Sequence, residues 1–398
     1  MRVGNVKAPI RIPAGFREGL DDLFHPPRAN VAALDVLRSA AILLVFTGHY
    51  AGFFHAAPLI PNFQIFRWGW TGVDLFFVLS GLLIGTQLWK ELDRTGRIRI
   101  GHFLLRRGLR IWPLYFSFVI FAAAALYFKR SSVATIWPDG FFLSNIFPGQ
   151  LGGGWSLSTE EQFYIAAPIL LSLFALMLLP RRLWIVPCIT IVALVLARAW
   201  VIAHSYLIET DLRIELYLPI YTHADGLAVG VLLAWLSVFH KAWLRLKTFT
   251  AVAAGTMIVC GFGLYRIDSL LLNFTALGLI YGSLELYAIS ALPLPGILRS
   301  RVFYLVSRLS FGLYLNHTGM LILMRNWFSG WSSRGIFGLW AVYFLCLAAS
   351  LFVAAVTFLV IEWPFLRIRA RWVDHQRLAA SPSAGPETPK SLAAGSAV

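Results

Sequence analysis

The sequence predicts an all-α polytopic membrane protein with about ten transmembrane helices and both termini in the cytoplasm (N-in and C-in). Of its 398 residues, 58% are hydrophobic and only 13% are charged, with a mean hydropathy of +0.71, whereas soluble domains carry about a quarter charged residues. Apolar runs of about twenty residues recur along most of the chain, and each is long enough to cross a hydrocarbon core. Lysines and arginines gather on alternate connecting segments, a pattern that sets orientation in a membrane.

The apolar runs place ten spans along the chain. Polar connecting segments separate them and mark where each span ends. The spans fall near residues 33–52, 70–89, 108–127, 156–179, 183–203, 218–238, 248–265, 270–291, 307–327 and 337–361.

The basic residues predict the topology. With the N-terminus inside, the cytoplasmic segments hold most of the lysines and arginines, including clusters at 90–99, 106–110 and 241–247. Because positive charge is retained on the cytoplasmic side, this bias also accounts for the net charge of +15, and nucleic acid is not expected as a partner. The opposite side holds Arg67, Lys129, Arg130, Arg213, Arg266 and Arg334.

Three regions follow from this division. Residues 1–32 form a basic, proline-containing cytoplasmic arm, residues 33–368 form the transmembrane domain, and residues 369–398 form a small, polar cytoplasmic tail that we expect to be disordered. The arm lacks the apolar segment of a cleavable signal peptide, and no internal repeat or appended soluble domain is expected. The three cysteines, Cys188, Cys260 and Cys346, lie far apart within apolar runs. We therefore expect them to pack between helices, and we expect neither a disulfide nor a metal site.

The longest non-cytoplasmic loop, residues 129–154, is rich in glycine, proline and aromatic residues, which suggests that it folds back at the interface. It ends in "LGGGWSLSTEEQFY", where flexible glycines give way to a helix. Ser156 or Ser158 is the expected helix cap, which would place Glu160 and Glu161 in the first turn, where the helix dipole favours negative charge.

Several ionisable side chains lie inside the predicted spans, where an arginine costs roughly 2.5–3.5 kcal/mol. Arg38 and His49 are eleven residues apart on one helix, a rise of about 16 Å. His49, Asp74 and Glu160 fall at the outer ends of three spans, whereas Arg107 and Arg110 lie one helical turn apart near the inner side. Each has a simpler interpretation as a packed histidine, an interfacial cap or a topology anchor. Together they suit chemistry on an anionic compound delivered from inside.

Seven blocks then resemble the acyltransferase 3 family of transmembrane acyltransferases, in the family's order and over about residues 33–368. They are "LRSAAILLVFTGH", "GVDLFFVLSGLLIG", "FLLRRGLRIWPLYF", "WSLSTEEQFY", "THADGLAVGVLLA", "SFGLYLNH" and "IEWPF". The chain departs from the family at His223, where arginine is commoner, and at Asn316, where an aromatic residue is commoner.

The resemblance implies an enzyme (EC 2.3.1.-) that uses cytoplasmic acyl-CoA, acetyl-CoA being the commonest, to acylate a hydroxyl of a glycan, glycolipid or other glycosylated acceptor. It implies a multi-pass protein of the bacterial inner membrane, with no metal and with an oligomeric state left open. The implied catalytic residues are His49, Glu160 and Asp74; Arg38, Arg107, Arg110 and Ser80 would bind the acyl-CoA; and Trp155, Ser156, Asp225 and His317 would bind the acceptor.

His49 would act either as a general base on the acceptor hydroxyl or as an acyl carrier. Glu160 would orient the imidazole, with Asp74 as the second candidate. Arg94, in the loop before the Arg107 helix, is expected to play no part in acyl-CoA binding.

The alternative function is a proton-coupled transporter or flippase of a glycan or lipid precursor, because buried ionisable residues also mark transport pathways.

Overall fold

The computed structural model describes residues 14–26, 32–54, 68–205, 211–290, 292, 294–332 and 334–380. Most of the predicted arm (1–13 and 27–31), Arg67 and the end of the tail (381–398) lie outside the described residues. The helices are α1 (Ala14–Phe24), α2 (Ala32–Phe53), η1 (Gly69–Thr71), α4 (Gly72–Thr95), α5 (Ile100–Phe128), η2 (Val133–Ile136), α6 (Trp137–Gly140), α7 (Gly154–Ala175), η3 (Pro180–Arg182), α8 (Ile185–Ala203), α9 (Leu212–Tyr217), α10 (Asp225–Phe239), α11 (Lys241–Arg245), α12 (Lys247–Ile267), α13 (Asn273–Ile289), η5 (Gly296–Arg299), α14 (Arg301–Ser332), α15 (Ile336–Thr357), the π-helical η6 (Phe358–Glu362) and α16 (Trp363–Ala380).

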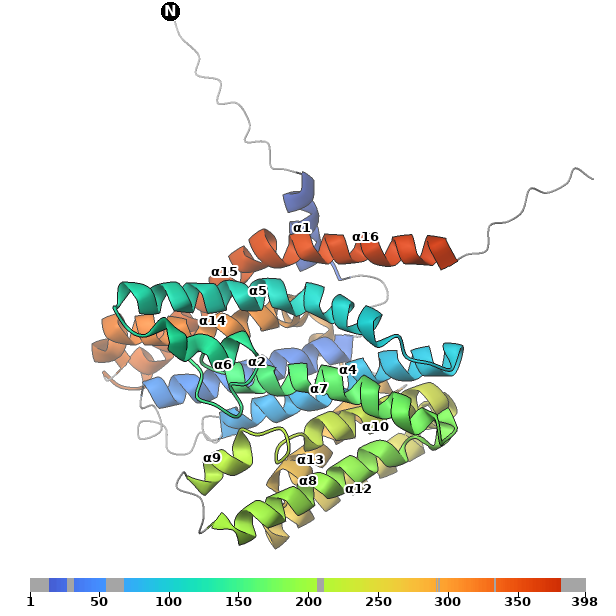
Figure 1. The fold of residues 1–398 in the computed structure, drawn as a ribbon. Coiled ribbons are helices and arrows are strands. Elements are labelled where there is room, and N and C mark those ends of the chain that lie inside the picture. The colour runs from blue at the N-terminus through green and yellow to red at the C-terminus, as the bar shows by residue number, and fades with distance from the viewer. Residues whose placement is uncertain are drawn as a thin grey trace, which may run out of the picture.

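The described residues form helices and no strand, which confirms the prediction of an all-α protein. The long helices run side by side in roughly one direction, and a helix lies at the position of each of the ten predicted spans (Figure 1). Among the described residues, six helical segments are long and apolar enough to cross a membrane: 32–53, 69–95, 100–128, 180–203, 247–267 and 336–372.

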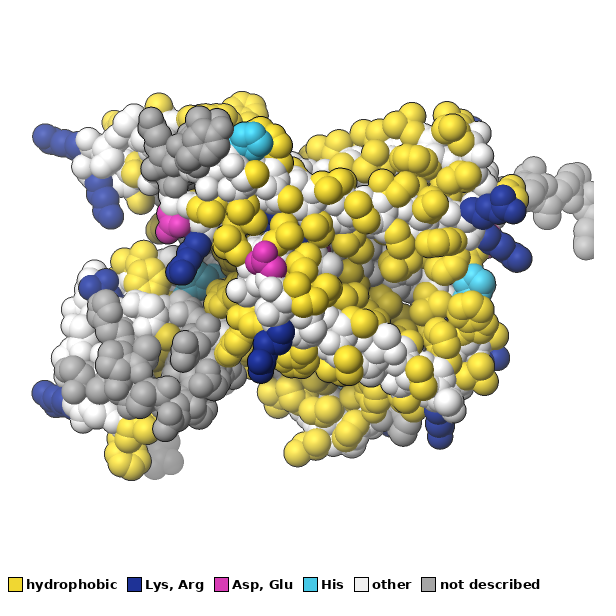
Figure 2. Space-filling view, turned by 90° about the horizontal axis from the view of Figure 1, so that it is seen from below, with side chains coloured by type: hydrophobic (Ala, Val, Ile, Leu, Met, Phe, Trp, Pro, Cys, Tyr) yellow, Lys and Arg dark blue, Asp and Glu magenta, His cyan; other side chains and the backbone are white. Residues whose placement is uncertain are grey.

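The surface fits a membrane environment. One face of the molecule consists mostly of hydrophobic side chains, with most of its lysine and arginine side chains toward the two ends (Figure 2). Exposed large apolar residues such as Phe121, Leu196 and Phe352 occur on the long helices. Because lipid is the solvent for such a surface, this distribution is expected for helices that cross a bilayer.

Helix α4 lies at the centre and packs most extensively against α10, with α2 and α13 also in contact. Glycines allow the close approach of α4 and α10. A Cβ atom added to Gly81 would collide with the Leu227 carbonyl, and one added to Gly230 would collide with the Val78 carbonyl. Small residues of this kind permit tight helix contacts in membranes, where burial of apolar surface gives little driving force.

On its other side, α2 packs against α14, and α14 packs against α15. Polar side chains hold this layer together. The Tyr50 hydroxyl donates to the Leu339 carbonyl at 2.6 Å, and the Asn316 amide donates to the carbonyls of Gly312 and Ser350. Asn316, a departure from the family pattern, therefore connects α14 to α15.

The segment between α5 and α7 is folded around a buried carboxylate. The Asp139 carboxylate accepts hydrogen bonds from the Ser144 hydroxyl at 2.7 Å and from the backbone N–H of Gln150 at 2.6 Å, while the Asp139 backbone carbonyl accepts from the Tyr115 hydroxyl. Gly153, with φ of +81°, precedes α7 and provides its N-cap. These contacts bring the loop back onto α5 and set the start of α7.

The predicted cap of α7 is wrong. The helix begins at Gly154, and the Ser156 and Ser158 hydroxyls donate to backbone carbonyls instead of capping its N–H groups. Glycine takes the cap position because the left-handed conformation there suits it best. Glu160 and Glu161 consequently lie beyond the first turn, where the helix dipole gives them little stabilisation.

Helix α1 contacts the start of α16 and the start of α14. The Trp363 indole donates to the Gly15 carbonyl at 2.8 Å, and Arg308 of α14 forms an ion pair with Asp22 of α1. Residues 369–380, predicted as the start of the tail, form the later part of α16.

Candidate active site

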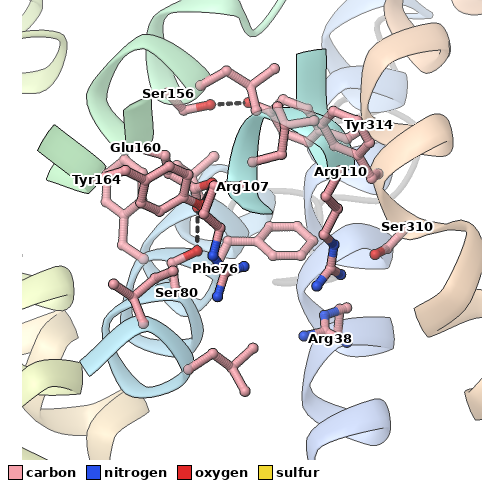
Figure 3. A pocket seen from close by; sticks show the side chains of 17 residues that line it. Arg38, Phe76, Ser80, Arg107, Arg110, Ser156, Glu160, Tyr164, Ser310 and Tyr314 are labelled. Atoms are coloured by element: carbon pink, nitrogen blue, oxygen red, sulfur yellow. Dashed lines mark hydrogen bonds between the residues drawn. The ribbon is translucent and has the colours of Figure 1, made fainter. Parts of the chain in front are cut away.

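A polar cavity of about 120 Å³ lies between α2, α4, α5, α7 and α14. Figure 3 shows Arg38, Arg107 and Arg110 directed toward it from two helices, together with Glu160 from α7. The lining also includes Ser80, Ser156, Tyr164, Ser310 and Tyr314. The structure thus gathers the predicted acyl-CoA-binding residues into one cavity.

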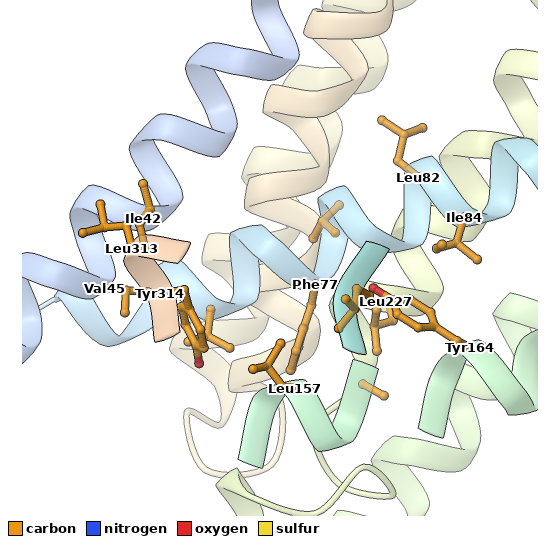
Figure 4. Packing of buried hydrophobic residues seen from close by; sticks show 14 of the residues in the cluster. Ile42, Val45, Phe77, Leu82, Ile84, Leu157, Tyr164, Leu227, Leu313 and Tyr314 are labelled. Atoms are coloured by element: carbon orange, nitrogen blue, oxygen red, sulfur yellow. The ribbon is translucent and has the colours of Figure 1, made fainter. Parts of the chain in front are cut away.

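Apolar side chains surround these polar groups. Phe77, Leu157 and Ile84 line the cavity and belong to the hydrophobic core, which also contains Tyr164 and Tyr314 (Figure 4). Electrostatic interactions in such surroundings are stronger than in water.

Glu160 lies among the arginines, which corrects its predicted place beside His49. Its carboxylate accepts hydrogen bonds from the Ser80 hydroxyl at 2.6 Å and the Tyr164 hydroxyl at 2.9 Å. The distance of each residue from the start of its helix explains why the two meet. Glu160 lies about 9 Å from the start of α7, and Arg110 lies about 15 Å from the start of α5, which begins on the opposite side of the bundle. Residues assigned to opposite sides of the membrane therefore meet in the interior.

The cavity has an excess of positive charge. Its lining contains three arginines and one carboxylate, that of Glu160. Arg38 donates to the Ser307 hydroxyl at 3.3 Å, and Ser307 donates to Asp35. Within the described part of the chain, Arg107 and Arg110 form no ion pair. Because cations withdrawn from water need compensation, this cavity suits an anionic ligand.

A second, larger cavity of about 460 Å³ shares Arg107 and Arg110 with the first. It is lined by further basic residues, among them Lys90 in the later part of α4, Arg99 directly before α5, and Arg369 of α16. Arg94, which the sequence placed in a loop apart from these arginines, also lines this cavity, because the last turn of α4 carries it to the same opening. The arginines of α5 therefore contribute to both cavities.

His49 pairs with His317, a contact that the sequence analysis did not anticipate. Nε2 of His317 lies 3.4 Å from Nδ1 of His49, and the ring centroids are 4.9 Å apart. Nδ1 of His49 also lies 3.0 Å from the Val45 carbonyl oxygen, which can only accept, so we assign the proton to this nitrogen. In the neutral ring, Nε2 of His49 is then the unprotonated nitrogen, and no hydrogen bond to it occurs among the described residues.

The same reasoning assigns His317. Its Nδ1 lies 2.6 Å from the Tyr314 carbonyl oxygen and therefore donates, which leaves Nε2 as an acceptor toward His49. Tyr314 itself lines the arginine cavity one turn away, where its hydroxyl is hydrogen-bonded to that of Ser156. His317 therefore lies one turn along α14 from a residue that lines the arginine cavity.

A third cavity, of about 490 Å³, lies at His49. Its lining comprises Gly48, His49, Gly52, Phe53, Trp70 and Arg325.

Asp74, the second candidate to orient His49, is instead paired with His223. Nε2 of His223 lies 2.9 Å from the Asp74 carboxylate, and both side chains are buried. Trp155, predicted to bind the acceptor, stacks on the His223 ring at 5.7 Å between centroids. Hence neither Asp74 nor Glu160 has a hydrogen bond to His49 among the described residues.

Asp225, another predicted acceptor residue, is neutralised inside the bundle. Its carboxylate receives two hydrogen bonds from Arg198, at 2.6 and 3.0 Å, and one from the Thr275 hydroxyl.

The sequence did not single out three polar residues of these sites: Arg198, Tyr164 and Arg325. Arg198 and Arg325 carried a signal, since each is a charged residue within a predicted span.

Fold and site define a helical membrane protein with an arginine-lined interior cavity, one lining residue of which, Tyr314, lies one turn from His317. The family model described as an acyltransferase domain matches residues 31–359. The chain therefore belongs to this acyltransferase family, as its sequence motifs predicted, and is a multi-pass membrane protein.

Similar proteins include the peptidoglycan O-acetyltransferase OatA of Listeria monocytogenes, 30% identical over 166 residues (37% of this chain and 25% of the relative). The O-acetyltransferase OatA of Staphylococcus aureus is 27% identical over 241 residues (54% of this chain and 36% of the relative). The chain thus spans about a quarter to a third of the length of these relatives. No solved structure matches it.

Proposed function

We propose that this protein is a membrane O-acyltransferase that moves an acyl group, acetyl in the first instance, from cytoplasmic acyl-CoA to a hydroxyl of a glycan, glycolipid or other glycosylated acceptor. One observation carries the proposal: two cavities share Arg107 and Arg110 in their lining, and the first of them is also lined by Tyr314, one turn from His317, which contacts His49. An anionic ligand that enters along the arginines would therefore reach toward an imidazole.

The proposed topology has ten transmembrane helices in the bacterial cytoplasmic membrane, with both termini inside. Two observations support it. A helix lies at the position of every predicted span, and the basic residues are concentrated on alternate connecting segments. In this orientation the arginine-lined cavities open toward the cytoplasm and the His49 cavity toward the other side.

Acyl-CoA suits the arginine-lined cavities by its chemistry. It carries several phosphate charges at one end and an uncharged thioester arm at the other. Arginine binds phosphate through paired, charge-assisted hydrogen bonds, so Arg107, Arg110 and the basic residues around them would hold the phosphates. The inner cavity, with apolar walls and the Ser80 and Ser156 hydroxyls, would take the thioester arm.

The proposed reaction begins with the acceptor hydroxyl at His49. Nε2 of His49 removes the hydroxyl proton while the oxygen bonds to the acyl carbon; the carbon–sulfur bond breaks, and the proton passes to the departing CoA thiolate. A positioned base of this kind contributes typically a 10²–10⁴-fold rate increase. His317 would act as a positioning residue, because its Nε2 accepts from Nδ1–H of His49 and stabilises the imidazolium.

An alternative order of events acylates His49 first and then transfers the group to the acceptor, which would let an acyl group cross the membrane without CoA. Quenching a single turnover and locating the label by mass spectrometry distinguishes the two. Acyl-His49 supports the relay, whereas its absence during productive turnover supports direct transfer.

The central test uses the full-length protein in detergent with radiolabelled acetyl-CoA and a glycan acceptor. His49→Ala should abolish transfer, at least 100-fold, without loss of folded protein, because the side chain lies at the edge of a cavity. Substantial turnover by this variant would remove His49 from the mechanism.

His317 provides a second arm of the same test. His317→Gln keeps an acceptor oxygen for His49 and should retain more activity than His317→Leu. Both changes should lower kcat and leave the KM for acetyl-CoA unchanged. Equal activity of the two variants would contradict the positioning role.

A further inference from the structure

The cavity at His49 has an unusual combination of lining groups. Gly52 is one turn from His49 on α2, and a Cβ atom added there would meet nothing within 4 Å, so open space lies beside the imidazole. Phe53 and Trp70 provide aromatic surface, and Arg325 of α14 provides a positive charge. Apolar faces and a cation next to a histidine suit a ring-shaped, negatively charged molecule.

Arg325 is the residue that distinguishes this cavity. It lies within the predicted span 307–327, is exposed, and forms no hydrogen bond or ion pair in the described part of the chain. Arg334, nearby in sequence, differs: its guanidinium lies 5.8 Å from the centre of the Trp331 ring, and it does not line the cavity. Arg325, in contrast, faces the space next to His49.

We propose that Arg325 binds an anionic group of the acceptor, a carboxylate or a phosphate, and that the protein therefore selects acidic saccharides. This inference rests on the proposed function, because it needs His49 to be the site of transfer. A guanidinium binds either group through two parallel hydrogen bonds. The sugar ring would lie against Trp70 and Phe53, with the hydroxyl to be acylated toward Nε2 of His49.

The test measures transfer from acetyl-CoA by the full-length protein to three probes: an oligosaccharide of N-acetylglucosamine and N-acetylmuramic acid, the same oligosaccharide with its carboxylates methylated, and N-acetylglucosamine 1-phosphate. Arg325→Gln should raise the KM for the preferred anionic probe at least tenfold, the scale of a hydrogen bond to a charged group. It should leave the KM for the methylated probe unchanged. Arg325→Lys should recover part of the affinity, and Arg334→Gln is the matched control and should change neither value.

The outcomes separate the two proposals. An effect on the carboxylated probe or on the phosphorylated probe supports the inference and identifies the group that binds. Equal KM values for charged and methylated probes, in wild type and in Arg325→Gln, overturn it and leave the acyltransferase proposal intact. Absence of His49-dependent transfer to any probe, together with no His49-dependent hydrolysis of acetyl-CoA, overturns both. Binding of the probes without acetyl-CoA gives an independent readout, and a loss of affinity confined to the charged probe in Arg325→Gln is the expected result.

Discussion

Two clusters of charged side chains lie inside this helical bundle, and they differ in how their arginines are used. Arg198 is fully buried and uses all five of its N–H donors, two of them toward Asp225 and the others toward Leu271, Thr222 and Thr275. Arg107 and Arg110 form no hydrogen bond to any described residue and line open cavities. The first cluster is complete in itself, whereas the second has donors available for a ligand. A buried arginine is thus no indication of function until its partners are known.

The largest expected effect is on the free energy of unfolding, which should differ between variants of Arg198 and variants of Arg110. Arg198→Met should destabilise the protein by about 3–5 kcal/mol, because it leaves the Asp225 carboxylate buried without its partner. Arg110→Met should cost little, since no carboxylate loses an ion pair. Thermal unfolding of both variants in detergent measures the difference. If Arg110→Met proves as destabilising as Arg198→Met, the distinction between the two clusters is lost.

A smaller effect concerns acyl-CoA affinity. Lysine keeps the positive charge that sets topology but lacks the planar fork of arginine. Arg107→Lys and Arg110→Lys should each weaken acetyl-CoA binding by about 1–3 kcal/mol, measured by calorimetry with membrane orientation unchanged.

Arg94 cannot serve as the control for this measurement, because it lines the same basic cavity. Arg245→Lys, on the exposed side of α11, is the better choice and should leave the affinity unchanged. Identical affinities for all of these variants would return Arg107 and Arg110 to the role of topology anchors.

The smallest expected effect comes from Glu160. Glu160→Gln removes the carboxylate that faces the three arginines, so acetyl-CoA should bind more tightly, by about 1 kcal/mol or less if the local charges are partly screened. Glu161→Gln is the matched control: Glu161 accepts from the Trp112 indole and does not line the cavity. Weaker binding by Glu160→Gln would mean that Glu160 holds the arginines in place more than it opposes the ligand.

Much of the candidate site was predictable because its residues stand out against their surroundings. Arg38, His49, Arg107 and Arg110 are polar groups in apolar helices, and the structure places all four on cavities. The partners of the carboxylates were not predictable in the same way. Position along a span indicates depth only coarsely, and it gives no information about which face of a helix meets which neighbour.

The sequence by itself determined the helical membrane class, the position of a helix at each predicted span and the family, because hydropathy over twenty residues and short motifs are local properties of the chain. Tertiary structure alone decided that His317 would meet His49, that Asp74 would pair with His223, and that Glu160 would face the arginines. The two histidine contacts join residues 268 and 149 positions apart, and the Ser80–Glu160 hydrogen bond joins residues 80 positions apart. All three depend on which helices pack together. That choice depends on contacts such as the glycine-lined approach of α4 to α10, where the absence of two side chains brings the backbones together and fixes which faces are buried.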